Sequence, residues 1–193
     1  MLLFGVNPLR IFLFKDGLVR FATEPYEKPK DENIDNLFMH LTNYAINKNS
    51  EAFVQNDGGC DGSQEDDDDG THKRSLKSLW STLRVMGHNV KKLKEEIKEL
   101  IIKTLITAQP SISHLIRSCQ PDDVENQLCF QILGFDVMLD DKCKPWLIEV
   151  NQSPSFKCES GLDARIKKKL VHDTLNLLNL SHKRKQKIVM HQK

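Results

Sequence analysis

The sequence predicts an α+β protein in which strand pairs and amphipathic helices surround one hydrophobic core. The prediction depends on two hairpin-like strand pairs and on two stretches where apolar residues recur with helical spacing. The chain has 193 residues with 39% hydrophobic content, which suits one good core and is too short for two full domains. We therefore expect a single compact unit.

The first strand pair is predicted near the N-terminus. The runs LRIFLF (9–14) and LVRFAT (18–23) flank a Lys-Asp-Gly turn at 15–17. An Asp-Gly pair between two β-prone runs favours a tight hairpin turn. Arg20 is therefore expected on a strand.

Two segments that follow are predicted to lack long regular elements. Residues 24–50 are rich in Pro, Asp and Asn, which suits an irregular crossover leading to a short element at HLTN (40–43). Residues 56–72 contain Gly, Asp and Ser with almost nothing apolar. Because they cannot bury enough surface to order themselves, we expect a disordered acidic loop.

Two amphipathic helices are predicted in the second half of the chain. Apolar side chains recur at helical spacing from Val90 until Pro110 approaches, with Lys and Glu between them. The pattern repeats over 163–180, where Asp163 is placed to cap the helix N-terminus. The apolar faces comprise Leu93, Ile97, Leu100, Ile101 and Leu105 in the first helix and Ile166, Leu170 and Leu177 in the second.

Composition and charge argue against several classes of function. A net charge of +1 gives no argument for nucleic-acid binding. The five cysteines include no C-x-x-C pair, which indicates reduced thiols in place of a disulfide framework or zinc site. The apolar start is interrupted by Asn7, Pro8 and Arg10, so neither a signal peptide nor a membrane span is expected.

The second strand pair carries polar residues inside otherwise apolar runs. CFQILGFDVMLD (129–140) and KPWLIEVN (144–151) are predicted to form a hairpin with a two- or four-residue loop. Either loop length pairs Asp136 with Leu147 and leaves Asp136 diagonal to Glu149, within side-chain reach.

Side-chain alternation gives this hairpin one polar face and one core face. Asp136, Glu149 and Asn151 share the polar face. Three oxygen donors without His or Cys suit Mg²⁺ or Mn²⁺ better than zinc, and Mg²⁺ with two carboxylates typically adds water and substrate phosphates. A nucleotide site is indicated, although an ordinary half-exposed strand also explains the spacing. The expected core face comprises Phe135, Val137, Trp146, Ile148 and Val150.

Three motifs together resemble the tubulin tyrosine ligase-like family of ATP-grasp amino-acid ligases, and most closely its polyglutamylases. They are PLRIFLFKDGLVRFATEPY, MHLTNYAINK and GFDVMLD with KPWLIEVNQSPSF. The resemblance runs from about Pro8 to Leu180. It implies an ATP-grasp-like fold, an antiparallel sheet with packed helices that grips ATP between two α+β subdomains. Residues 1–180 would form its C-terminal portion, and 181–193 a basic tail.

The resemblance also implies roles for individual residues. The Mg²⁺ ligands would be Asp136, Glu149 and Asn151. ATP would contact Thr42, Asn43 and Ile148. Free L-glutamate would be held by Arg20, Tyr44, Ala45, Lys73 and Gln152, with Arg20 and Glu149 as the catalytic residues. The planar guanidinium of Arg20 suits a carboxylate, while a surface salt bridge is the plain alternative.

The implied activity is ATP-dependent ligation of glutamate. ATP would phosphorylate a glutamate side chain on a tubulin tail, and the amine of free glutamate would attack the acylphosphate. The expected partners are α- or β-tubulin tails and microtubules, with no nucleic acid and no membrane. We expect a monomer in the cytoplasm and on the cytoskeleton, including a cilium or basal body. Lysines 167–169 and SHKRKQK (181–187) would attract acidic tails, although a solvated helix face also explains them.

Departures from the family pattern bear on activity. The family's N-terminal half of the ATP clamp, with its phosphate-contacting lysines, is not found before Pro8, where MLLFGV stands in place of the preceding strand. Ala45 replaces a usual serine, Gln152 a common histidine, and an acidic insert at 61–70 lengthens a short loop. We therefore expect negligible glutamylation by these residues alone. The alternatives are a non-catalytic chain that only binds tubulin, and a glycylase or tyrosine ligase.

Overall fold

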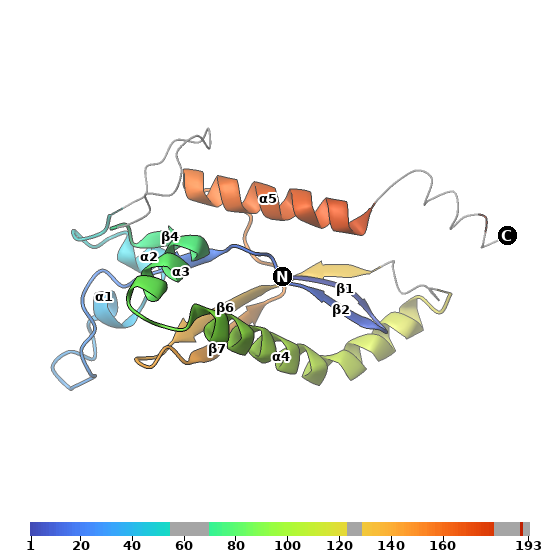
Figure 1. The fold of residues 1–193 in the computed structure, drawn as a ribbon, viewed down its shortest axis with the longest axis horizontal. Coiled ribbons are helices and arrows are strands. Elements are labelled where there is room, and N and C mark those ends of the chain that lie inside the picture. The colour runs from blue at the N-terminus through green and yellow to red at the C-terminus, as the bar shows by residue number, and fades with distance from the viewer. Residues whose placement is uncertain (55–69, 123–128, 180–189, 191–193) are drawn as a thin grey trace. The chain divides into compact units, whose positions relative to one another are not determined.

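The computed structural model describes residues 1–54, 70–122, 129–179 and 190, and these contain helices and short antiparallel strand pairs (Figure 1). The α+β prediction is therefore confirmed. The chain divides into two compact units, whereas its length predicted one. Unit 1 comprises Met1–Lys15, His88–Phe156 and Lys169–Lys193, and unit 2 comprises Asp16–Gly87 and Lys157–Lys168.

Unit 1 contains a three-stranded antiparallel sheet with strand order β2-β1-β5. Its strands are β1 (Leu2–Val6), β2 (Leu9–Phe12) and β5 (Phe130–Ile132). Helix α4 (Val90–Cys119) runs alongside strands β1 and β2 in Figure 1. One core cluster of unit 1 consists of Met1 and Leu3 from the sheet side and Ile101 and Leu105 from the helix.

The predicted hairpin between residues 9–14 and 18–23 is wrong. Strand β2 pairs with β1, and β3 (Leu18–Arg20) pairs with β4 (Lys73–Ser75) in unit 2. Leu9 and Ile11 of β2 pack on the core that β1 helps to build, so β2 buries more apolar surface there than beside the mostly exposed β3. The Asp-Gly pair forms only a local bend, in which the Gly17 N–H donates to Asp16 Oδ1 at 2.9 Å.

Helix α4 continues past Pro110, where the sequence analysis expected it to end. Ile112 and Ile116 lie beyond the proline and are half-buried, so the apolar spacing of the helix continues through this region. The Gln109 side chain donates to the Val6 carbonyl at 2.8 Å, which ties the same stretch of helix to β1. These contacts compensate for the hydrogen bond that a proline inside a helix removes.

Unit 2 contains the β3–β4 pair and several short helices. These are α1 (Leu37–His40), α2 (Tyr44–Asn47), α3 (Leu76–Val85) and residues 161–168 of α5 (Gly161–Leu178). Helix α3 was not predicted, although Ser75 caps it by accepting from the Ser78 N–H at 3.1 Å and Trp80 and Leu83 are buried.

The start and the apolar face of α5 differ slightly from the prediction. The Asp163 N–H donates to Ser160 Oγ at 3.2 Å, so Ser160 and not Asp163 occupies the capping position. Leu177, which was expected on the apolar face, is exposed, and its neighbour Leu178 is buried in its place. The buried residues of the helix are Leu162, Asp163, Ile166, Thr174 and Leu178.

The predicted acidic loop (56–72) and basic tail (181–193) fall almost entirely outside the described residues. At the base of the loop, the His72 N–H donates to the Val54 carbonyl at 3.1 Å and the Val54 N–H donates to His72 Nδ1 at 2.9 Å. The four cysteines in the described part of the chain form no disulfide. Within the same residues, no helix has the length and apolarity needed to cross a membrane.

Candidate functional site

The predicted metal ligands lie on the hairpin of β6 (Gly134–Leu139) and β7 (Pro145–Asn151) in unit 1. Asp136 is directly opposite Glu149, closer than the diagonal that was predicted. The Asn151 amide donates through Nδ2 to Glu149 Oε1 at 3.1 Å. All three side chains therefore share one face, as side-chain alternation predicted.

An extra residue in β7 sets this register. Asp136 pairs with Glu149 and Val137 with Leu147, so Ile148 is a bulge residue without a cross-strand partner. The predicted loop length is wrong because Leu139 pairs with Pro145, which leaves residues 140–144 in the loop. The predicted pairing of Asp136 with Leu147 fails for the same two reasons.

Asp140 fixes the loop between these strands. Its Oδ1 accepts from the N–H groups of Lys142 and Lys144, and its Oδ2 accepts from Trp146 Nε1, each at 2.9 Å. The hydrogen bond from Trp146, followed by those from the Lys144 and Lys142 backbone, holds the pKa of Asp140 below its usual value. The Lys144 ammonium lies 4.2 Å from the centre of the Trp146 ring. A charged Asp140 thus holds the loop that sets the register.

The predicted core face of the hairpin is only partly correct. Phe135 packs against the core of unit 1. Trp146, Ile148 and Val150 are instead 51%, 57% and 39% exposed. The bulge shifts Trp146 to the side of Asp136 and Glu149, because residues on either side of an extra residue no longer alternate in step. Apolar surface therefore lies next to the oxygen donors.

The donor set of the hairpin fits a hard cation bound together with a phosphate ligand. No three His, Cys, Asp or Glu side chains in the described parts of the chain are placed to hold a metal ion. The hairpin offers two carboxylates and one amide, and the Nδ2 bond to Glu149 leaves Oδ1 as the acceptor atom of Asn151. Mg²⁺ typically takes one or two carboxylates and completes its shell with water and substrate phosphates.

In unit 2, three of the predicted glutamate-binding residues come together. Arg20 of β3 is directly opposite Lys73 of β4. The Lys73 Nζ lies 5.1 Å from the centre of the Tyr44 ring, and that ring stands edge-on to Phe53 at 5.8 Å. Ala45 follows in α2 and is exposed.

A buried asparagine holds the segment that carries Thr42 and Asn43. Asn47 is 1% exposed. Its Nδ2 donates to the carbonyls of Leu41 at 2.7 Å and Asn43 at 3.2 Å. Its Oδ1 accepts from both the N–H and the hydroxyl of Thr23 at 3.0 Å. Asn43 occupies the N-cap position of α2, but its side chain makes no capping hydrogen bond.

Replacing Asn47 with alanine is expected to lower the free energy of unfolding by about 1–3 kcal/mol for each buried group left without a partner. The Leu41 carbonyl and the Thr23 hydroxyl would lose their bonds to Asn47, whereas the Thr23 N–H would keep its bond to the Phe38 carbonyl at 3.1 Å. Urea unfolding at neutral pH measures the change. Asn49→Ala is the matched control, since Asn49 is exposed and donates only to the Ala45 carbonyl at 3.2 Å. Equal effects of the two substitutions would contradict the role of Asn47.

The predicted site residues divide between the two units. Asp136, Ile148, Glu149, Asn151 and Gln152 belong to unit 1, whereas Arg20, Thr42, Asn43, Tyr44, Ala45 and Lys73 belong to unit 2. The Gln152 carbonyl accepts from Gln131 Nε2 at 2.5 Å, which fixes the chain just after Asn151. Each set is assembled within its own unit.

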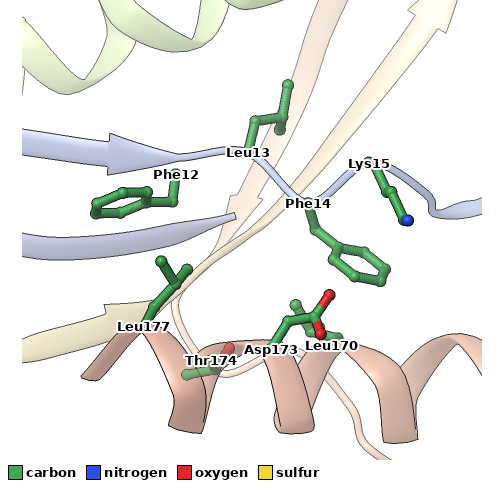
Figure 2. Close-up of a pocket in the computed structure, with 8 residues that line it drawn as sticks. All are labelled: Phe12, Leu13, Phe14, Lys15, Leu170, Asp173, Thr174 and Leu177. Carbon is green, nitrogen blue, oxygen red and sulfur yellow. The ribbon is translucent and has the colours of Figure 1, made fainter. Parts of the chain in front are cut away.

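A small cavity of unit 1 contains none of these residues. It has a volume of about 190 Å³ and lies between the segment after β2 and helix α5 (Figure 2). In Figure 2, Phe14 is directed toward the helix and Leu13 away from it. The lining is mainly apolar, with Lys15, Asp173 and Thr174 as its polar members. Nothing in this lining resembles the oxygen donors of the hairpin.

The sequence analysis missed two residues that organise unit 2. Asn47 lies within the MHLTNYAINK motif, which was the available signal in the sequence. Its burial and hydrogen-bond partners become visible only in the structure, where a buried polar residue must find partners. Asp163 was noted only as a helix cap. The structure places its carboxylate 2.6 Å from Lys73 Nζ.

Comparison with known proteins gives consistent matches over the whole chain. A family model described as the tubulin-tyrosine ligase family matches residues 1–187. The chain is 47% identical over 193 residues to a probable beta-tubulin polyglutamylase of Tetrahymena thermophila, covering 100% of this chain and 16% of that protein. It is 44% identical over 189 residues to tubulin polyglutamylase TTLL6 of Mus musculus, covering 98% and 22%.

A third relative, tubulin polyglutamylase TTLL7 of Xenopus tropicalis, is 40% identical over 195 residues, covering 100% of this chain and 20% of that protein. The chain thus spans between 16% and 22% of the length of these three curated relatives.

Proposed function

The chain belongs to the tubulin-tyrosine ligase family, and on that premise we propose that it supplies part of the active site of an ATP- and Mg²⁺-dependent tubulin polyglutamylase of the ATP-grasp fold. The observation that carries the proposal is 40% to 47% identity, over essentially the whole chain, to proteins named tubulin polyglutamylases. The reaction adds free L-glutamate to glutamate side chains of α- or β-tubulin tails on microtubules.

Hairpin β6–β7 is the proposed metal and nucleotide wall of this site. Asp136, Glu149 and Asn151 hold Mg²⁺ through oxygen atoms, and the bond from Asn151 to Glu149 keeps the two side chains oriented. Ile148, which is exposed beside Glu149, offers apolar surface to the adenine base. Thr42 and Asn43 are the proposed polar contacts to ATP. When bound, ATP and Mg²⁺ supply the phosphoryl group that activates the tubulin carboxylate and neutralise charge on the phosphates.

The β3–β4 pair is the proposed site for free glutamate. Arg20 and Lys73 are cross-strand neighbours, so two cations face one region. The planar guanidinium of Arg20 can bind a carboxylate through two parallel hydrogen bonds. Tyr44, Ala45 and Gln152 are the remaining proposed contacts to glutamate.

Helix α5 is a proposed contact for the acidic tubulin tail. Lys167 is already paired with Asp163 at 3.4 Å and its side chain is only 15% exposed. Lys168 and Lys169 are exposed, and although Lys169 lies 4.0 Å from Asp173, both are better suited than Lys167 to attract an anionic tail. A salt-dependent association with microtubules follows from this arrangement.

The proposal is tested in a chimera in which these 193 residues replace the matching segment of the Mus musculus relative. We expect ATP-dependent incorporation of tritiated glutamate into tubulin. Parallel reactions with glycine and tyrosine separate glutamylation from the related ligase activities. An inactive chimera that still sediments with microtubules would contradict the enzyme and favour a binding function.

Mg²⁺ is expected to bind the hairpin weakly even without nucleotide, because Asp136 and Glu149 place two carboxylates opposite each other. Titration of Mg²⁺ into the 193-residue chain should give saturable shifts of the Asn151 side-chain amide in the NMR spectrum. Glu149→Gln should abolish these shifts. Shifts that persist in that variant would indicate that the ion binds elsewhere.

A further inference from the structure

Two cations occupy paired positions in the β3–β4 sheet. Arg20 and Lys73 are directly opposite each other, and side chains at paired positions of antiparallel strands point to the same face. Like charges at such positions repel and weaken the pairing. An anion close to one of them offsets that cost, and Asp163 is an anion in contact with Lys73.

Asp163 makes an asymmetric set of contacts. Its Oδ2 lies 2.6 Å from Lys73 Nζ and also accepts from the Ser160 hydroxyl at 3.2 Å and from the Glu159 N–H at 3.3 Å. Its Oδ1 is buried without a hydrogen-bond donor among the described residues, and the Lys167 ammonium is 3.4 Å away. The Asp163 side chain is 1% exposed and that of Lys73 is 14% exposed.

This environment keeps the carboxylate charged. Burial by itself would raise the pKa of Asp163, but the hydrogen bond and charge of Lys73, joined by the charge of Lys167, outweigh burial and hold the pKa below its usual value. The carboxylate therefore remains an anion at neutral pH. Lys73 and Lys167 thus both lie close to a charged Asp163, and Arg20 is the cross-strand neighbour of Lys73.

We infer that Asp163 is a positioning residue for the amino-acid substrate: it fixes the Lys73 ammonium beside Arg20 and over Tyr44, so that two preset cations meet a substrate bearing two carboxylates. The inference rests on the proposed function, in which Arg20 and Lys73 contact glutamate. An ammonium has three donors. Among the described residues, Asp163 accepts from one of them and the Tyr44 ring provides a second anchor at 5.1 Å, which leaves a donor for the ligand.

A purely structural role for Asp163 is the competing explanation. Asp163 lies three residues after Ser160 and shares two hydrogen bonds with it, which resembles a capping box. A capping box is local and needs no cation from a residue 90 positions earlier in the chain. The two roles make different predictions, because a helix cap affects stability alone, whereas a positioning residue also changes the affinity for one substrate.

Kinetics of the chimera separate these roles. Asp163→Asn is expected to raise KM for glutamate by about tenfold or more, the size expected from the loss of one hydrogen bond to a charged group, while KM for ATP stays unchanged. In a Lys73→Met background, the same substitution should change neither constant, because Asp163 then has no ammonium to position. Ser160→Ala is the matched control: it weakens the helix start and removes the Ser160 hydroxyl from Asp163 Oδ2, but it keeps the carboxylate and its ion pair with Lys73.

Each outcome decides the inference. An unchanged KM for glutamate in Asp163→Asn, or an equal rise in Ser160→Ala, overturns it. If Asp163→Asn fails to fold, the double variant Lys73→Met with Asp163→Asn, which removes both charges, is compared with Lys73→Met alone. A higher KM for glutamate in the double variant overturns the inference. If the unsubstituted chimera is inactive, the proposed function fails. The NMR signal of the Lys73 ammonium in the 193-residue chain then decides, since it should shift on adding L-glutamate and fail to shift in Asp163→Asn.

Discussion

Glutamate transfer by the chimera is expected to fall by about a hundredfold to a thousandfold when Glu149 is replaced by glutamine, which is the usual effect of removing one preorganised electrostatic group. Glutamine keeps the size of the side chain and an oxygen that can accept from Asn151 Nδ2. The substitution therefore removes charge and leaves packing intact. Initial rates of tritiated glutamate incorporation at saturating ATP and tubulin measure the loss.

The matched control for this prediction is Asp141→Asn. Asp141 is an exposed carboxylate in the loop of the same hairpin, so its replacement changes the net charge by the same amount. The control should keep the full rate, and Asp136→Asn should lose as much as Glu149→Gln because the two residues are paired. A Glu149→Gln chimera that transfers glutamate at the unsubstituted rate would show that the metal oxygens come from other residues.

The shared face of the candidate metal ligands could be predicted from the sequence because it depends on local geometry. Side chains alternate along any strand, so Glu149 and Asn151 must lie on one side. The register could not be predicted in the same way. It depends on the bulge at Ile148 and on three hydrogen bonds that the Asp140 carboxylate makes within its loop. Neither feature can be recognised from the alternation of apolar and polar residues in the sequence.

The β3 pairing shows the opposite case, in which a local signal was overridden. An Asp-Gly pair between β-prone runs favours a hairpin only if the two strands also share a core. Leu9 and Ile11 pack with the core of unit 1, while Arg20 pairs with Lys73 in unit 2. The better burial of β2 beside β1 decided the pairing, and sequence periodicity carries no information about such a competition.

The partners of Lys73 and Asn47 were also beyond local pattern analysis. The ion pair joins residues separated by 90 positions, and Asn47 bonds to Thr23 across 24 positions. Contacts of this kind leave no periodic trace in the sequence. The family resemblance suggested that Lys73 matters for glutamate, but it did not indicate which group holds the lysine in place.

Asp163→Asn is expected to lower the free energy of unfolding by about 3–5 kcal/mol at pH 7, the typical cost of breaking a buried ion pair from one side. Asn cannot neutralise Lys73, whose side chain is only 14% exposed. The pKa of Asp163 is lowered from its usual 3.8 in the folded protein. A carboxylate of this kind contributes stability above its unfolded pKa and loses that contribution as the pH falls through the lowered folded pKa. Urea unfolding from pH 7 down through that range measures the difference.

The pH dependence distinguishes the ion pair from simple packing. If the charge of Asp163 stabilises the fold, the difference between the unsubstituted chain and Asp163→Asn must shrink as the pH falls from 3.8 through the lowered pKa of folded Asp163, because below that folded pKa both proteins carry a neutral side chain at this position. The double variant Lys73→Met with Asp163→Asn should regain much of the stability at pH 7, since it buries no unpaired charge. A difference that stays constant with pH would mean that shape and helix capping, and not the bond to Lys73, account for the stability that Asp163 provides.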